Sequence, residues 1–130
     1  AKNFIKSSKI NEGRAVSNLL NQACEACEIG APLIPEHEQE TLLVNLDGWI
    51  IDRSENPKLV NEYRFNSYAN ASRFVTLIVN LAESEDHHPK ITLEWGLVIL
   101  EWWSHKIKGL HMNDFICATK SDEIFNRLER

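Results

Sequence analysis

The segment from Thr92 to Ser104 constrains the fold of this chain more than any other. Its hydropathy alternates with a period of two residues, which is typical of a β-strand. Both faces of this expected strand are apolar. One face carries Trp95, Leu97, Ile99 and Trp103, and the other carries Val98, Leu100 and Trp102. A strand with one face in water would alternate cleanly between apolar and polar residues. The segment is long for one strand, so we expect a bend or bulge at Gly96.

Two apolar faces require cover on both sides of the strand. Helices against one face and another surface, such as a second subunit, against the other would supply it. A central strand buried within one subunit is an equal alternative. We expect amphipathic helices over 67–84 and 112–128, where apolar residues recur three and four positions apart. Pro89 requires the first of these helices to end before it.

The remaining expected elements are shorter. A brief helix is expected over 16–23, and another begins after Pro35 and ends near Gly48, its expected C-cap. Two strands follow over 49–53 and 58–65, joined by a turn at 54–57. This order of helices and strands predicts an α+β fold with an antiparallel sheet.

Length and charge limit the domain count and the partners. The chain has 130 residues and a net charge of −5, and we expect a flexible tail over 1–15 and a single domain over 16–130. The acidic balance argues against a nucleic-acid partner held through its phosphates. No secretory signal is visible, and no apolar run approaches the roughly 20 residues that span a bilayer. We therefore expect no membrane partner and a cytoplasmic location.

Three cysteines leave several interpretations open. Cys24 and Cys27 have the spacing of half a zinc site or of a redox pair, and Cys117 is distant in the sequence. A zinc ribbon needs a second pair of this kind. We favour reduced thiols near a helix end, which agrees with a reducing compartment.

Four of the five histidines lie between His87 and His111. Surface histidines plus one core histidine are the first interpretation. A zinc site formed by His87, His88, His105 and Asp114 is the second, although no pair has the i, i+4 spacing common in zinc enzymes. General acid–base chemistry is the third, because histidine exchanges its proton near neutral pH. Asp114, in the first turn of the last helix, should stay ionised and support a neighbouring imidazole.

A set of short motifs at matched spacing resembles the pterin-4a-carbinolamine dehydratase family. The motifs are Ala82-Glu83, His87-His88-Pro89, Ser104-His105, Gly109-Leu110 and Asp114. The stretches Glu94-Trp95-Gly96, Trp102 to His105 and Cys24 to Cys27 are similar to the bacterial branch associated with phenylalanine hydroxylase. The resemblance covers about residues 23–125 and favours the acid–base interpretation.

This resemblance implies both a fold and a reaction. The family fold is a four-stranded antiparallel sheet with three helices packed on one face. The family converts 4a-hydroxytetrahydropterin to quinonoid dihydropterin and water. The leaving 4a-hydroxyl must be protonated and the N5 proton removed, which histidines can do. The pterin is the substrate, and neither a metal nor a redox cofactor is implied.

The resemblance also implies site residues. His87 and His105 would form the catalytic acid–base pair, and Asp114 would orient and charge-support His105. His88 would assist catalysis by positioning the pterin, and Glu83 matches a substrate-binding acidic position of the family near the pterin. The further substrate-binding positions implied are Pro89, Ser104, Lys106 and Ile107. The tryptophans are expected in the core or at a subunit contact.

One position departs from the family pattern. The family often has Thr where this chain has His111, three residues before Asp114, and that hydroxyl would cap the last helix in a capping box. A histidine cannot cap in the same way, so we expect a weaker cap at His111 in preference to a role in the site.

Protein partners follow from the same resemblance. It implies a homodimer or homotetramer, with an aromatic amino acid hydroxylase as a further partner. The alternative function is a non-enzymatic protein-binding or coregulator module, as a dimerisation partner of a transcription factor or a regulator of a hydroxylase. An intact set of three histidines and an aspartate favours the enzyme.

Overall fold

The computed structural model describes residues 19–25 and 31–128. A helical turn at 19–21 precedes the named elements. These are α2 (Glu36–Leu43), β1 (Ile50–Asp52), β2 (Lys58–Arg64), α3 (Tyr68–Glu85), β3 (Lys90–Glu94), β4 (Leu97–Trp102) and α4 (Met112–Arg127). The expected tail over 1–15, the first part of the brief helix expected over 16–23 and Cys27 lie outside the described residues.

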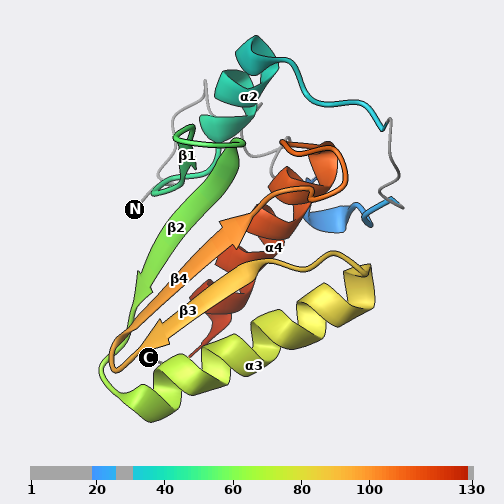
Figure 1. Ribbon diagram of the computed structural model, residues 1–130. Helices are drawn as coiled ribbons and strands as arrows, with labels where there is room; N and C mark the ends of the chain where they lie inside the picture. The colour runs from blue at the N-terminus through green and yellow to red at the C-terminus, as the bar shows by residue number, and fades with distance from the viewer. Residues whose placement is uncertain (1–18, 26–30, 129–130) are drawn as a thin grey trace, which may run out of the picture.

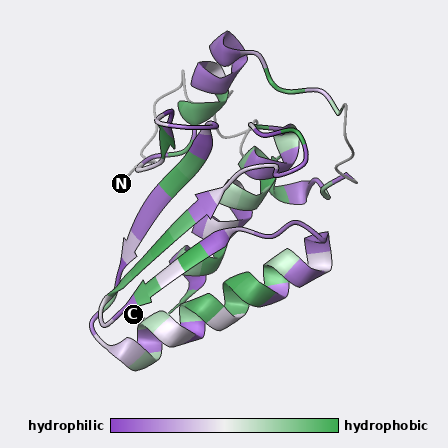
Figure 2. Cartoon of the chain, viewed as in Figure 1, coloured by the Kyte–Doolittle hydropathy of each residue, from purple (hydrophilic) through white to green (hydrophobic). Residues whose placement is uncertain are grey.

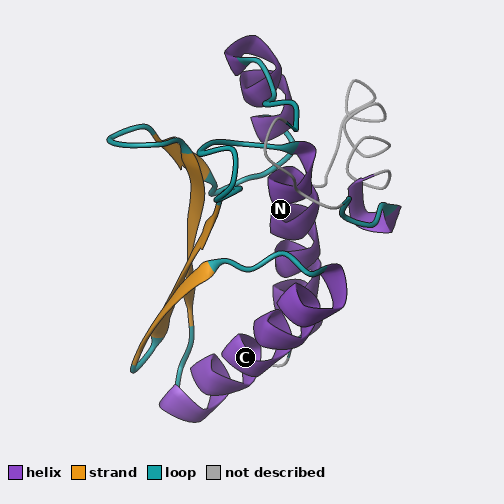
Figure 3. Ribbon diagram, turned by 45° about the vertical axis from the view of Figure 1, so that its right-hand side comes forward, coloured by secondary structure: helices purple, strands orange, loops and turns teal. Residues whose placement is uncertain are grey.

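The strands form one antiparallel sheet in the order β1-β2-β4-β3. Both long helices, α3 and α4, lie on the same side of this sheet, and α2 lies beyond one of its ends (Figures 1 and 3). The predicted α+β fold with a four-stranded antiparallel sheet is therefore confirmed. The helical turn at 19–21 lies within the brief helix expected over 16–23 and is added to the three helices of the family fold.

The bend or bulge expected at Gly96 is a full reversal of the chain at Trp95-Gly96, so the segment over 92–104 contributes to two strands. β3 and β4 pair antiparallel, with Glu94 opposite Leu97. The turn needs a glycine, since a Cβ at Gly96 would lie 2.8 Å from the carbonyl oxygen of Phe65. The N–H of Phe65 in turn donates to the carbonyl oxygen of Gly96 at 2.9 Å. This close approach allows a tight reversal, which leaves Trp95 exposed at its tip.

β4 has two different faces, as its sequence indicates. Val98, Leu100 and Trp102 are fully buried beneath the helices. Leu97 and Ile99 on the opposite face are only half-buried. A central strand buried on both sides within one subunit is therefore wrong. Cover from a second subunit stays a prediction.

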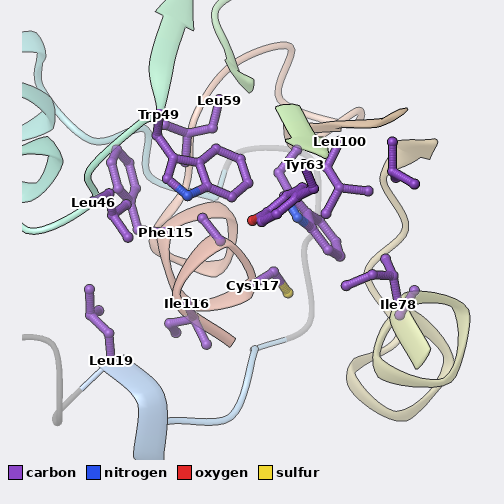
Figure 4. Packing of buried hydrophobic residues seen from close by; sticks show 14 of the residues in the cluster. Leu19, Leu46, Trp49, Leu59, Tyr63, Ile78, Leu100, Phe115, Ile116 and Cys117 are labelled. Carbon is purple, nitrogen blue, oxygen red and sulfur yellow. The ribbon is translucent and has the colours of Figure 1, made fainter. Parts of the chain in front are cut away.

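The core lies between the sheet and the two long helices. The apolar stripe expected on the helix over 67–84 is present in α3, where Ala71, Phe74, Ile78 and Ala82 are buried. In Figure 2 hydrophobic residues alternate with hydrophilic ones along α3. Figure 4 shows Leu59, Tyr63 and Leu100 of the sheet above Phe115 and Cys117 of α4. The sheet and both helices thus share one apolar layer, in which burial of each large side chain contributes roughly 1.5–3 kcal/mol.

A carboxylate joins α4 to the sheet inside this layer. Asp122 accepts hydrogen bonds from the Tyr63 hydroxyl at 2.6 Å and from the Trp49 indole N–H at 3.1 Å. Burial, together with the charge of Asp122, raises the pKa of Tyr63 well above its ordinary range. These bonds explain why an acidic residue lies in register with the apolar residues of α4.

The helix expected to end near Gly48 ends earlier. Leu43 is the last residue of α2 and Val44 is its C-cap. Turns follow, closed by hydrogen bonds from the N–H groups of Leu46 and Trp49. Gly48 has a φ of 88°, so it supplies the left-handed conformation needed at the entry to β1. It is not the cap of the helix.

Candidate active site

Two chain connections bring the predicted residues to one end of the sheet. Residues 86–89 join α3 to β3, and residues 103–111 join β4 to α4. Lys90 at the start of β3 lies opposite Glu101 near the end of β4. Both connections therefore leave the sheet at the same end, which Figure 1 shows in yellow and orange.

The C-terminus of α3 fixes the position of His87. Asp86 adopts the left-handed conformation with a φ of 51°, which Asp tolerates better than most residues. The N–H of His87 then donates to the carbonyl oxygen of Ala82 at 3.1 Å, as in a Schellman motif. The sharp turn buries His87 and leaves His88 exposed. The two adjacent histidines thus occupy different environments.

A buried imidazole–carboxylate pair forms at this point. Nε2 of His87 lies 2.6 Å from Oδ1 of Asp114, and the two side chains are only 7% and 0% exposed. The ring of His87 also stacks on the indole of Trp102, with planes inclined by 13°. Because its Nε2 is bonded to the carboxylate, His87 has only Nδ1 left for another partner.

The second carboxylate oxygen of Asp114 is occupied as well. Oδ2 accepts hydrogen bonds from the Ser104 hydroxyl and from the backbone N–H of His111, both at 2.9 Å. The expectation that Asp114 orients His105 is therefore corrected: Asp114 orients His87. The reason is that Asp114 points into the interior from the first turn of α4, whereas His105 lies on an exposed turn.

His111 caps α4 despite the absence of a hydroxyl. Its Nδ1 accepts a hydrogen bond from the N–H of Asn113 at 3.0 Å, and Asp114 bonds back to the N–H of His111, which completes a capping box. The expected cap at His111 is therefore present, with an imidazole nitrogen in place of a hydroxyl, and its lower strength stays a prediction. His111 also contributes to the site, because its backbone N–H helps to hold the carboxylate of Asp114.

The other two histidines are exposed. Nε2 of His88 lies 2.6 Å from Oε2 of Glu83. His105 begins a turn over 105–108 whose base is closed by the N–H of Ser104 bonding to the carbonyl oxygen of Gly109 at 2.8 Å. The ring of His105 packs on the indole of Trp103, with centroids 4.2 Å apart. A surface pair such as His88–Glu83 adds little stability, so its main effect is to orient the imidazole.

Comparison with known proteins shows the family of this chain. Residues 32–124 match the model of the family described as pterin 4 alpha carbinolamine dehydratase. The chain belongs to this family. A relative from Vibrio vulnificus is 49% identical over 102 residues, which cover 78% of this chain and 93% of the relative. One from Saccharophagus degradans is 43% identical over 111 residues, covering 85% and 98%. Both relatives carry the name of the family.

Two solved structures share the fold. A protein from Brucella melitensis, described as a transcriptional coactivator/pterin dehydratase, has a TM-score of 0.68 and 25% identity, covering 72% of this chain and 98% of its own. A pterin dehydratase-like protein, described as a RuBisCO assembly factor in the alpha-carboxysome, has a TM-score of 0.52 and 22% identity, covering 59% and 88%. The second likeness shows the fold alone.

The remaining family positions lie beside the histidines. Pro89 is half-buried, Lys106 is exposed and Ile107 is half-buried. Within 19–25 and 31–128, no group of three or more His, Cys, Asp or Glu side chains could hold a metal ion, so the four residues of the alternative zinc site do not converge. None of the helices in that part of the chain is long and apolar enough to cross a membrane.

Sequence reasoning missed two aromatic contacts of the histidines. Trp102 stacks on His87 from within the core, and Trp103 packs on His105 from the other face of the strand. Nζ of Lys58 lies 4.5 Å from the ring centroid of Trp103. The alternation of β4 contained a signal, because adjacent tryptophans in a strand point to opposite faces.

Proposed function

We propose that this chain dehydrates 4a-hydroxytetrahydropterin to quinonoid dihydropterin and water, in the recycling of the pterin cofactor of an aromatic amino acid hydroxylase. The dehydratase class, a hydro-lyase, is that of its family and of its named relatives. The observation that carries the proposal is the buried His87–Asp114 pair, with two exposed histidines on the connections at the same end of the sheet.

The reaction is an elimination with no net oxidation. The C4a–O bond breaks, the N5–H bond breaks and a C4a=N5 double bond forms, while the hydroxyl leaves as water. One group must donate a proton to the hydroxyl and another must accept the N5 proton. Two imidazoles are sufficient for both transfers, so the proposal needs no metal and no redox cofactor.

His87 and His105 are the proposed acid–base pair. The carboxylate of Asp114 fixes the orientation of the His87 ring and leaves Nδ1 for the transferred proton. His105 is exposed on its turn, and Trp103 limits the rotation of its ring. The two histidines thus combine an anchored group with an accessible one, which an elimination with two proton transfers requires.

His88 is the proposed positioning residue for the pterin. Its bond to Glu83 holds the ring at the surface with Nδ1 free to meet a heterocycle. Nearby positions proposed to contact the substrate are Pro89, Ser104, Lys106 and Ile107. Ser104 would shape the site from within, because its hydroxyl is bonded to Asp114 and its backbone N–H to Gly109.

A protein-binding function is the second candidate. The description of the Brucella melitensis protein names both a transcriptional coactivator and a pterin dehydratase. The outer face of the sheet, which includes the half-buried Leu97 and Ile99, supports association as a homodimer or homotetramer. Light scattering tests this point: a mass above 15.0 kDa per particle is expected, and a clean monomer would contradict it.

The test of the enzyme function is the dehydration rate of synthetic 4a-hydroxytetrahydropterin, followed by absorbance against its spontaneous rate. Wild-type protein, with and without prior chelator treatment, should accelerate the reaction equally and with repeated turnover. A binding module without activity would leave the spontaneous rate unchanged, and that result would overturn the proposal. Loss of activity after chelation would overturn the metal-free mechanism.

A further inference from the structure

Cys24 and Cys117 are in contact although 93 positions separate them in the sequence. Their Sγ atoms lie 3.5 Å apart. Cys117 is completely buried on α4, and Cys24 is half-buried in the segment over 24–25. Neither thiol has a part in the proposed dehydration. The sequence favoured reduced thiols, and the one pairing that its spacing offered joined Cys24 with Cys27.

Hydrogen bonds hold the backbone of this segment in place. The N–H of Cys24 donates to Oε1 of Glu85 at 2.8 Å, and Glu85 also bonds to Nζ of Lys120 at 2.6 Å. The N–H of Glu25 donates to the side-chain oxygen of Asn113 at 2.9 Å, and the side-chain amide of Asn113 returns a bond to the carbonyl oxygen of Glu25 at 2.7 Å. Both long helices therefore fix the position of Cys24 above Cys117.

We propose that Cys24 and Cys117 form an intramolecular disulfide when the protein meets a low-molecular-weight disulfide such as glutathione disulfide. The thiolate of Cys24 first attacks the oxidant, which forms a mixed disulfide and releases one glutathione thiol. Sγ of Cys117 then attacks Sγ of Cys24 and releases the second glutathione, which takes up the proton of Cys117. Two protein thiols are oxidised and one glutathione disulfide is reduced to two thiols.

Exposure sets the order of these steps. Only Cys24 reaches solvent, because Cys117 is 0% exposed. The hydrogen bond with Cys24 and burial both raise the pKa of the Cys117 thiol, so it stays protonated at neutral pH. The first of these causes disappears once Cys24 carries glutathione, which favours attack by Cys117 at that stage.

The disulfide would join the segment over 24–25 covalently to α4, close to the first turn of that helix, which contains Asp114. Sγ of Cys24 already lies 3.8 Å from the carbonyl oxygen of Asn113. The loop closed by the bond is long, so a disulfide here removes much of the freedom of the unfolded chain. The oxidised protein should unfold at a higher temperature than the reduced one, by on the order of 10 °C.

The experiment equilibrates the whole chain in buffers with increasing ratios of oxidised to reduced glutathione, then quenches with acid, blocks free thiols and maps the digested peptides by mass spectrometry. Wild type and the control C27S should both yield a peptide pair joined through Cys24 and Cys117, together with the shift in unfolding temperature. The variant C24S should yield neither.

Three results would overturn the proposal. The first is a bond between Cys24 and Cys27 as the main product. The second is one equivalent of zinc bound to the reduced wild type, with thiols that resist oxidation until a chelator is added. The third is an absence of any protein disulfide at the most oxidising ratio. The control C27S leaves both cysteines of the pair unchanged. Circular dichroism shows whether this control is folded.

Discussion

Replacing Asp114 by Asn removes the charge of this buried side chain and keeps its volume. Two of its three hydrogen bonds, from Ser104 and from the N–H of His111, fall on the same oxygen. The oxygen of an asparagine can keep both. Its amide must then donate toward Nε2 of His87, which the carboxylate now meets at 2.6 Å. The variant D114N thus forces His87 into the tautomer that accepts at Nε2, with its proton on Nδ1.

The expected losses follow from these contacts. One charge-assisted hydrogen bond contributes about 1.5–3 kcal/mol, so D114N should lower the free energy of unfolding by about 2 kcal/mol. The variant D114A removes the acceptor for all three donors in a fully buried place and should cost about 3–5 kcal/mol. The wrong tautomer at His87 should lower kcat for the dehydration by about 10²–10⁴-fold in D114N.

Urea unfolding gives the stability of each variant, and dehydration kinetics give kcat and KM. The nitrogen chemical shifts of His87 report the tautomer directly. The matched control is D122N, because Asp122 lies on the same helix but bonds to Tyr63 and Trp49 away from the histidines. It should lose stability and keep its kcat. If D114N kept wild-type kcat and tautomer, the role given to Asp114 would be refuted.

Three further predictions concern stability. Burial alone would raise the pKa of Glu85, but the N–H of Cys24 and the ammonium of Lys120 hold it below its ordinary value. The ionised Glu85 therefore stabilises the folded state above the unfolded pKa of about 4.3. This contribution is lost as the pH falls through the lower folded pKa. E85Q should therefore cost about 1 kcal/mol at pH 7 and almost nothing at pH 3 in urea titrations, and an equal cost at both values would contradict the assignment. H111A should lose about 1 kcal/mol and H111N much less, because Asn is a good N-cap; equal losses would argue against capping by His111. F74A should lose about 3–5 kcal/mol by the same measurement, and a loss below 1 kcal/mol would place Phe74 outside the core.

Periodicity was enough to predict the long helices and the class of the fold. Ala71, Phe74 and Ile78 share one face only if the segment is helical, and all three are buried on α3. The reversal at Trp95-Gly96 was predicted only as a bend or bulge, because the strands on both sides alternate with the same period. Its cause is the approach of Gly96 to the carbonyl of Phe65, a contact distant in sequence.

The sequence predicted which residues belong to the site. It did not predict which histidine pairs with Asp114. The family resemblance implied that Asp114 orients His105, but the turn over 105–108 directs His105 to solvent. The left-handed Asp86 turns His87 inward, where it meets the carboxylate. Such a pairing depends on how two connections cross at one end of the sheet, which local patterns do not contain.

The most direct test of histidine catalysis is the ratio of single-turnover dehydration rates between wild type and H105Q. His105 is exposed on a turn, so the variant should fold normally. The control is H37Q, which changes an exposed histidine on α2. We predict a loss of about 10²–10⁴-fold for H105Q and no change for H37Q. A folded H105Q with the wild-type rate would contradict the proposal that His105 takes part in the proton transfers.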